Sequence, residues 1–470
     1  MATTAAPGVR TVNPYLHGSF APTAAEATVG EGFEVIGQVP RDLAGTFLRN
    51  GPNPRLPPRG EYHWFDGDGM VHGFTVADGQ VSYRARWVAT PGLASEVEAG
   101  AARWTGLLEP TAGNPAGAPY KDTANTDLVV HRGEALALWY MSGQPQALDP
   151  HSLAGRGGRD WGQPGLRVSA HAKVCPRTGE LVFFASSPTA PYLHVGVVDA
   201  DGHLRLHQPV PLPGPRVPHD LAITERFVVV MDPPLVPHPK AVAAGRWGVR
   251  VDRDLPLRFG VVPRAGGAAR WFDATPAYVY HVVNAWDDGD RVVVIGCRTA
   301  DPLPAVDPAD GRFAPMMANL RLTAALWRWE LDLATGALRE QQLDDANLEF
   351  PVVDHRVVGQ PGPVGYAVTL GPTPTLTFTG VRKVGMDGRH LAAHDFGPGR
   401  FGSEVAVAPR VGAAPGVGAG DDTYVLSYVH DEGTGRSEVM IFEHDLTVRA
   451  RVLLPVRVPL GFHGCWAPAS

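Results

Sequence analysis

Short runs of β-branched and aromatic residues, broken repeatedly by glycine and proline, constrain the fold of this chain more than any other feature. The 470 residues include 55 Gly and 45 Pro, and no long segment repeats its apolar residues with a helical period. Many runs adjoin turn sequences such as Ala77-Asp-Gly and Ala334-Thr-Gly, which favour hairpins. The pattern predicts an all-β protein.

Strand-like runs recur along the whole chain without an internal sequence repeat. Good examples are Glu134–Met141, Glu180–Ser186, Phe227–Met231, Arg291–Cys297, Leu326–Leu333 and Tyr424–Val429. A single open sheet of about twenty strands or more would have to curl, and a sandwich is too small to hold them. A β-propeller therefore fits the pattern better than either alternative.

The predicted propeller forms one domain, because no low-complexity linker divides the chain and all-β domains are often large. We expect a flexible N-terminus over residues 1–12 and a single domain over residues 13–470. Two proline-rich segments, Pro233–Pro263 and Ala300–Arg321, are predicted to be long loops that cover one face.

Composition limits the classes of function. Hydrophobic residues make up 44% and charged residues 19% of the chain, as in a globular protein with a sizeable core. The net charge of −7 and the lack of a basic stretch argue against nucleic-acid binding. Three dispersed cysteines argue against a disulfide framework and favour a cytoplasmic protein. Neither a signal peptide nor an apolar run of about 18 residues is apparent, and nothing sets an oligomeric state.

Four histidines lie in apolar, strand-like segments that are far apart in the sequence. They are His171, His219, His281 and His463. Neutral imidazoles are good ligands for Fe, Zn, Cu or Ni, but the short His-to-His spacing of a local metal motif is absent here. Because the chain has 18 histidines, and strand histidines are often core residues bonded to backbone groups, the spacing alone leaves both interpretations open.

Two glutamates in apolar segments extend the metal interpretation. Glu349 lies in Asn347-Leu-Glu-Phe-Pro, and Glu404 in Phe401-Gly-Ser-Glu-Val. A histidine that binds a metal usually donates its second ring N–H to a carboxylate, and an unpartnered buried carboxylate is costly. We therefore predict a buried partner for each glutamate.

Several longer motifs resemble the carotenoid cleavage oxygenase family, which includes apocarotenoid-, stilbene- and isoeugenol-cleaving enzymes. The resemblance extends from about Asn13 to Pro468. In chain order, the motifs are Phe47-Leu-Arg-Asn-Gly-Pro-Asn-Pro, Tyr62-His-Trp-Phe-Asp-Gly-Asp-Gly-Met-Val-His-Gly, Ala124-Asn-Thr, His281-Val-Val-Asn-Ala-Trp and Pro459-Leu-Gly-Phe-His-Gly-Cys-Trp-Ala-Pro. The resemblance implies a seven-bladed propeller, with loops and short helices over one face and non-haem Fe(II) on its axis.

The same resemblance assigns roles to individual residues. It implies that the four histidines bind the iron and that Glu349 and Glu404 orient two of them. At the position of a third orienting glutamate this chain has Tyr140, whose phenol we expect to serve as a neutral hydrogen-bond partner. Thr126 matches a threonine whose methyl group crowds an open metal position. Trp139 replaces a lysine of the stilbene-cleaving relatives, and we predict that it contacts substrate and favours an apolar polyene.

The activity that the resemblance implies is that of an oxidoreductase, a dioxygenase that uses O2 to cleave a double bond of a carotenoid or apocarotenoid into aldehyde or ketone products. Alternatives are cleavage of a stilbene or phenylpropanoid alkene, a non-redox retinoid isomerase or lyase, and a non-catalytic propeller. Polyenes reside in membranes, so peripheral contact is expected through the apolar residues within Pro233–Pro263, which are separated by basic ones. These apolar residues are Leu235, Val236, Trp247, Val249 and Val251.

Overall fold

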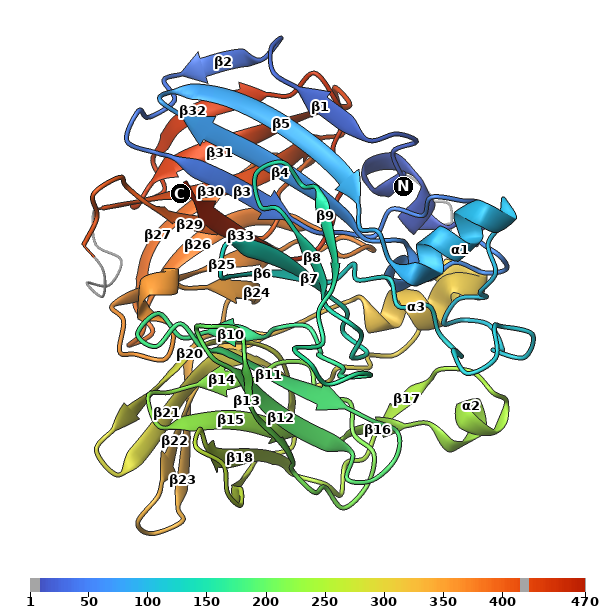
Figure 1. Cartoon of the computed structure of the whole chain (residues 1–470), viewed down its shortest axis with the longest axis vertical. Coiled ribbons are helices and arrows are strands. Elements are labelled where there is room, and N and C mark those ends of the chain that lie inside the picture. The colour runs from blue at the N-terminus through green and yellow to red at the C-terminus, as the bar shows by residue number, and fades with distance from the viewer. Residues whose placement is uncertain (1–8, 415–421, 470) are drawn as a thin grey trace, which may run out of the picture.

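The computed structural model describes residues 9–414 and 422–469 and is a seven-bladed β-propeller, as predicted (Figure 1). Within these residues, seven sheets of four to six strands are the blades. Of the segment expected to be flexible, residues 1–8 lie outside the described residues. The backbone N–H of Arg10 donates to the Ala309 carbonyl at 2.8 Å, so the chain contacts the domain from that point on.

Five blades are each built from strands that are close in sequence. Blade 2 contains β6 (Asp127–His131), β7 (Glu134–Leu138), β8 (Gln146–Leu148) and β9 (Gly155–Gly158). Blade 3 contains β10 (Lys173–Val174), β11 (Leu181–Ser186), β12 (Leu193–Val198) and β13 (Leu204–Pro209). Blade 4 contains β14 (Ala222–Ile223), β15 (Phe227–Asp232), β18 (Leu257–Pro263) and β19 (Arg270–Ala274). Blade 5 contains β20 (Tyr278–Asp288), β21 (Arg291–Thr299), β22 (Ala325–Asp332) and β23 (Leu338–Asp344). Blade 6 contains β24 (Leu348–Val352), β25 (Val364–Leu370), β26 (Phe378–Gly385) and β27 (His390–Asp395).

The other two blades combine strands from distant parts of the chain and close the ring. Blade 1 contains β1 (Ala27–Val29), β5 (Gln80–Trp87), β4 (Met70–Ala77), β3 (Gly45–Arg49) and β33 (Gly464–Pro468). Blade 7 contains β2 (Glu34–Gly37), β32 (Val448–Leu453), β31 (Arg436–Glu443), β30 (Thr423–Asp431), β28 (Arg400–Phe401) and β29 (Ala406–Pro409). The antiparallel pairing of β3 with β33 sets Leu48 opposite Cys465. A closed ring leaves few exposed sheet edges.

Local sequence explains both the hairpins and the packing of the blades. Between β4 and β5, Asp78 and Gly79 have φ of 48° and 73°, the left-handed pair that a two-residue hairpin turn requires. Between blades 4 and 5, the rings of Phe259 and Trp329 are buried with their centroids 5.1 Å apart. Large apolar side chains of this kind fill the space between neighbouring sheets to the density of a protein core.

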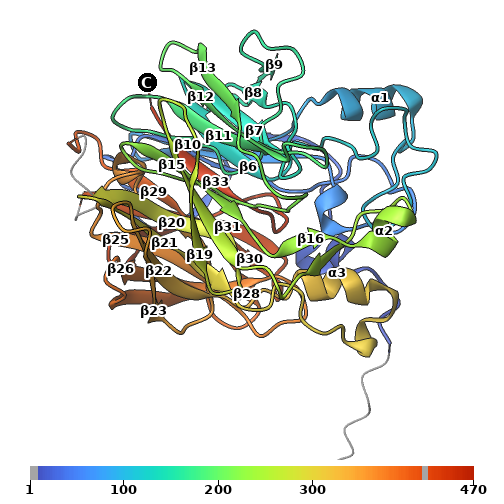
Figure 2. The same ribbon diagram turned by 90° about the horizontal axis from the view of Figure 1, so that it is seen from below.

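Short helices and one hairpin gather at one side of the propeller, as Figure 2 shows for α1, α2, α3 and β16. These elements are α1 (Pro91–Ala99), α2 (Pro239–Ala243), α3 (Ala314–Asn319), β16 (Leu235–Pro237), β17 (Val249–Val251), η1 (Pro14–Leu16), η2 (Gly18–Phe20), η3 (Trp64–Asp66) and η4 (Pro308–Phe313), whereas η5 (His355–Val357) follows β24. The prediction that Pro233–Pro263 is a loop was wrong in part. Its last seven residues, Leu257–Pro263, are β18, whose apolar run pairs with β15. No helix in the described residues is long and apolar enough to cross a membrane.

Candidate metal centre

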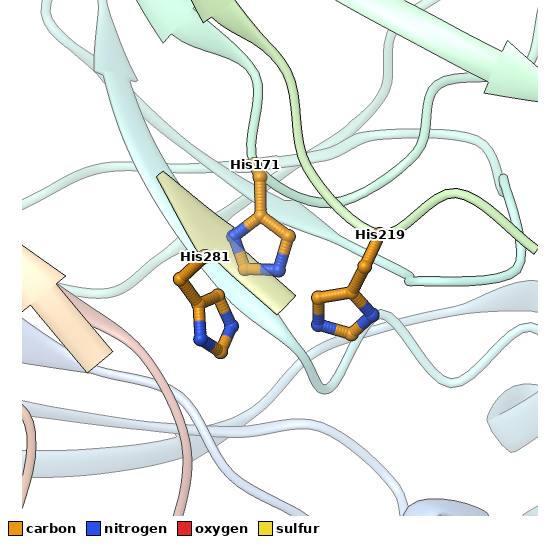
Figure 3. A group of neighbouring side chains, drawn as sticks. All are labelled: His171, His219 and His281. Carbon is orange, nitrogen blue, oxygen red and sulfur yellow. The ribbon is translucent and has the colours of Figure 1, made fainter. Parts of the chain in front are cut away.

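Four histidine side chains from four different blades meet inside the propeller. His171 lies just before β10, His219 just before β14, His281 in β20 and His463 just before β33. The ring centroids of neighbouring histidines are 4.5 to 5.1 Å apart. Figure 3 shows three of these rings entering one small region from separate segments. The fold therefore brings together residues that lie almost 300 positions apart in the sequence.

The nitrogen atoms of this cluster suit a divalent metal ion. Ligand nitrogens of His171, His219 and His281 all lie within 4.8 Å of one another. Within the described residues, the Nε2 atoms of His171 and His281 are buried and have no hydrogen-bond partner, which is costly unless another group binds them. Burial lowers the pKa of His219 to about 3 and the pKa of His171 and His281 well below the usual value. These imidazoles are neutral near pH 7, as metal ligands must be.

Glu349 and Glu404 each contact a different histidine of the cluster, so the predicted buried partners are present. Glu349 lies in β24, and its Oε2 is bonded to Nδ1 of His281. Oε1 of Glu404 lies 3.0 Å from Nδ1 of His463. Each carboxylate also accepts a backbone N–H at 2.7 Å, from Phe350 and Gly464 respectively. An acceptor at Nδ1 fixes the tautomer of each ring and leaves Nε2 for the shared space.

Two aspartates hold the backbone around the cluster, Asp220, which lies next to a predicted ligand, and Asp127, which the sequence analysis did not select. Oδ2 of Asp127 accepts the N–H of His171 at 2.9 Å, where His171 has a left-handed φ of 68°. Asp220 accepts the N–H of Val282 at 2.7 Å and lies 2.8 Å from Nζ of Lys173. Both aspartates adjoin residues that were selected, Thr126 and His219, and a carboxylate in an apolar segment was the available signal.

Tyr140 follows β7, but its phenol does not form the hydrogen bond to a histidine that was expected. Its hydroxyl is buried without a hydrogen-bond partner, and burial raises its pKa well above the usual value. In the part of the chain that the structure describes, neither this hydroxyl nor any other group forms a hydrogen bond with the imidazole of His219. The ring of Tyr140 instead packs against Phe65, with centroids 5.1 Å apart. The structure therefore does not form the expected phenol–imidazole bond.

Thr126 and Trp139 line two different cavities, and Tyr140 lines both. The hydroxyl of Thr126 accepts the N–H of Tyr140 at 3.2 Å and donates to Oδ1 of Asn125 at 3.0 Å, so its polar atom is fully engaged. Thr126 lines the cavity that reaches the histidines. Trp139 is 6% exposed and lines a separate cavity, with Tyr140 between the two. Contact of Trp139 with a substrate stays a prediction.

The cavity beside the histidines has a volume of about 810 Å³ and is largely apolar. Among the described residues that line it, none is Lys, Arg, Asp or Glu. Leu235, Trp247 and Val249, which are among the residues expected to contact a membrane, line this cavity. Phe350 supports the centre from β24, because its ring stacks on His463 with centroids 4.5 Å apart. An apolar chamber thus adjoins the cluster.

Comparisons with known proteins agree with this geometry. The family model described as retinal pigment epithelial membrane protein matches residues 20–468. Carotenoid 9,10(9',10')-cleavage dioxygenase 1 of Pisum sativum is 33% identical over 96% of this chain and 89% of its own length. Isoeugenol monooxygenase of Pseudomonas nitroreducens is 30% identical over 97% of this chain and 98% of its own length.

Solved structures give the same picture. Lignostilbene dioxygenase of Pseudomonas brassicacearum superposes with a TM-score of 0.87 at 30% identity, over 99% of this chain and 100% of that one. A cobalt-substituted Synechocystis apocarotenoid oxygenase superposes with a TM-score of 0.82 at 28% identity, over 95% of this chain and 97% of that one. All these relatives are named as oxygenases.

The propeller, the buried histidines and these matches define an oxidoreductase of the oxygenase class. More narrowly, the chain belongs to the carotenoid cleavage oxygenase family, which the retinal pigment epithelial membrane protein model represents.

Proposed function

We propose that this protein cleaves a double bond of a carotenoid or apocarotenoid with O2, using Fe(II) held by His171, His219, His281 and His463. The alkene and one O2 molecule give two carbonyl products, so both oxygen atoms are retained. The observation that carries the proposal is the uncharged apolar cavity that is lined by three of the four imidazoles, those of His219, His281 and His463. Bound ferrous iron would supply the activation of O2 that this reaction needs.

The residues of the chain would bind and orient the substrate. The apolar wall would hold a polyene by excluding water from it, as in other small-molecule sites. The methyl group of Thr126, whose hydroxyl is engaged elsewhere, would limit the space beside the histidines. Glu349 and Glu404 would keep two imidazoles aimed at the metal through their Nδ1 bonds.

Stilbene or phenylpropanoid cleavage is the competing activity, because relatives with those names match over nearly the whole chain. The cavity disfavours it, since no cationic side chain among its described lining residues could meet a phenolate. The test is anaerobic Fe(II) reconstitution, followed by exposure to air with β-apocarotenals, full-length carotenoids, resveratrol and isoeugenol. Mass spectrometry should find paired carbonyl products from a polyene. Products from the phenolic compounds alone would overturn the proposal.

We also propose a cytoplasmic protein that contacts membranes to collect its substrate. On α2, Val242 is 60% exposed, and Lys240 and Arg246 lie near it in the sequence. Exposed apolar residues among basic ones favour shallow contact with an anionic lipid surface. Cosedimentation with anionic liposomes that Val242→Glu weakens would support this contact, and no cosedimentation of the unmodified protein would exclude it.

A further inference from the structure

One polar atom in the wall of the apolar cavity has no role in the metal centre. His63 is 1% exposed and lines the same cavity as His219, His281 and His463. Its Nδ1 lies 3.1 Å from the backbone N–H of Phe65, which places His63 at the N-terminal cap of η3. Within residues 9–414 and 422–469, its Nε2 is buried and has no hydrogen-bond partner.

The cap fixes the protonation of this imidazole. Nδ1 accepts the N–H of Phe65, so it carries a lone pair and not a proton. Burial lowers the pKa of His63 to about 3, so the ring is neutral near pH 7. The single ring proton therefore lies on Nε2, and this atom is a hydrogen-bond donor without an acceptor.

The surroundings of His63 define the chemistry of the missing acceptor. Its ring contacts Phe65 and Trp247, with centroids 4.9 and 6.4 Å away. Because no Lys or Arg lines the described part of the cavity, an ionised carboxylate beside His63 would be desolvated without a basic side chain to pair with it. A neutral oxygen, such as a carbonyl or a hydroxyl, satisfies the donor without that penalty.

We propose that Nε2–H of His63 donates to a neutral oxygen at one end of the substrate, so that the enzyme prefers oxygenated polyenes such as apocarotenals to hydrocarbon carotenes. This inference rests on the proposed function and adds a residue that selects the substrate class. Sites built around a hydrogen-bonding group reject analogues that leave the group unpaired. The hydroxyl of Tyr140, which packs against Phe65 and has no hydrogen-bond partner in the described residues, is one competing donor, and the hydroxyl of Tyr280 in the same cavity wall is another.

The test compares β-apo-8'-carotenal with a matched hydrocarbon in which a methyl group replaces the aldehyde. His63→Asn is the main variant, because a shorter amide oxygen can still cap the N–H of Phe65, while no N–H donor remains at the position of Nε2. Tyr140→Phe is the control for the first competing donor. Metal-free proteins are titrated with each compound by quenching of tryptophan fluorescence, and the carbonyl stretch of the bound aldehyde is recorded by Raman spectroscopy.

The unmodified protein should bind the aldehyde about tenfold more tightly than the hydrocarbon, the effect of one hydrogen bond at this scale. The carbonyl stretch of the bound aldehyde should give a Raman band at lower frequency than that of the aldehyde in hexane. His63→Asn should remove both effects and leave hydrocarbon binding within about twofold. A preference that survives His63→Asn, or one that Tyr140→Phe abolishes, would overturn the proposal. Equal weakening of aldehyde and hydrocarbon binding in His63→Asn would also overturn it, because that result indicates a structural role for His63.

Turnover of the iron-loaded enzyme separates this inference from the proposed function. If unmodified and His63→Asn enzymes cleave both polyenes with the same ratio of kcat/KM values, the proposed function stands and the role of His63 is refuted. If the unmodified enzyme cleaves neither polyene, the proposed function fails. Aldehyde selectivity in the binding titrations would still support the donor role of His63 in that case.

Discussion

Individual carboxylates and hydroxyls beside the histidines determine how firmly the centre can hold a metal. Glu349 and Glu404 each bond one imidazole at Nδ1, whereas Tyr140 bonds none. Substitution of Glu349 and substitution of Tyr140 are thus expected to change metal binding very differently. The contrast gives two predictions at the residue scale.

Replacing Glu349 with Gln should weaken metal binding by about 10- to 100-fold, because a neutral amide does not raise the basicity of the His281 imidazole as a carboxylate does. Competition with a coloured chelator for Co(II) or Fe(II), without oxygen, measures the affinity. Glu225→Gln is the matched control, since that side chain is 58% exposed and pairs with Arg177. An unchanged affinity in Glu349→Gln would show that the carboxylate does not support the metal.

Replacing Tyr140 with Phe should leave metal affinity within about twofold, because the hydroxyl bonds neither a ligand nor any other described group. Removing an unpaired buried hydroxyl should leave stability unchanged or raise it by about 1 kcal/mol. Chelator competition and urea denaturation measure the two quantities. A large loss of metal affinity would instead indicate that the phenol reaches His219 in the metal-bound protein.

At the scale of elements, hydrogen bonds between blades hold the ligand strands in register. Asp220, just before β14, is 2% exposed and bonds the backbone of β20 and the side chain of Lys173 in β10. One carboxylate therefore ties together the segments that carry His171, His219 and His281. Its effect should appear in stability as well as in metal affinity.

Substituting Asp220 by Ala should destabilise the protein by about 1–3 kcal/mol, since it leaves the buried N–H of Val282 unpaired and removes the partner of Lys173. Metal affinity should fall in parallel, because three ligand segments lose their common tie. Asp288→Ala is a suitable control, as its ion pair with Arg291 is largely exposed. Equal urea midpoints for the two variants would contradict the role of Asp220.

The 3-10 helix η3 gives a prediction for pH. The Asp66 carboxylate accepts the backbone N–H groups of His63 and Leu107. Burial raises the pKa of this carboxyl group to about 7. A folded-state pKa above the unfolded value means that the folded protein binds more protons, so this contribution to stability is lost as pH rises from about 4 to about 7. The loss is at most about 1.4 kcal/mol per pH unit. Asp66→Asn should be less sensitive to pH over that range in urea denaturation, and an identical profile would refute the assignment.

Elements were predictable from sequence where pairing is local. Arg291–Cys297 was expected as a strand and is part of β21 (Arg291–Thr299), because alternate apolar residues and turns define it. Glu134–Met141 ends earlier than expected, at Leu138 in β7, because the N–H of Tyr140 bonds the side chain of Thr126 instead of a strand. The β18 strand was missed because prolines at both ends of Pro233–Pro263 suggested one continuous loop.

For the whole molecule, the metal centre links blades 1, 3, 4 and 5 through one histidine each. Such a convergence could not be derived from spacing, since each ligand lies in a different sheet. Apolar contexts singled out the four histidines and the two glutamates, and the resemblance to a family supplied their shared role at one metal. Asp127 and the tautomer of His63 depend on bonds to backbone N–H groups, which no side-chain pattern records.

Adding Fe(II) or Co(II) without oxygen should raise the thermal unfolding midpoint, because a ligand that binds only the folded state stabilises it. At a free concentration of 100 times Kd, the gain is about 2.7 kcal/mol. EDTA should reverse the shift, and His463→Ala, which removes the ligand from blade 1, should reduce it strongly. Differential scanning calorimetry measures the midpoint. A shift that persists in His463→Ala would show that the metal binds elsewhere.

The pairing of β3 with β33 has a consequence for biosynthesis. During translation, β3 leaves the ribosome long before β33 and must wait with an unpaired edge, which is a template for aggregation. His463 immediately precedes β33, so a nascent chain cannot assemble all four imidazoles until the ring is ready to close. Binding of a metal by all four imidazoles would therefore follow completion of the propeller.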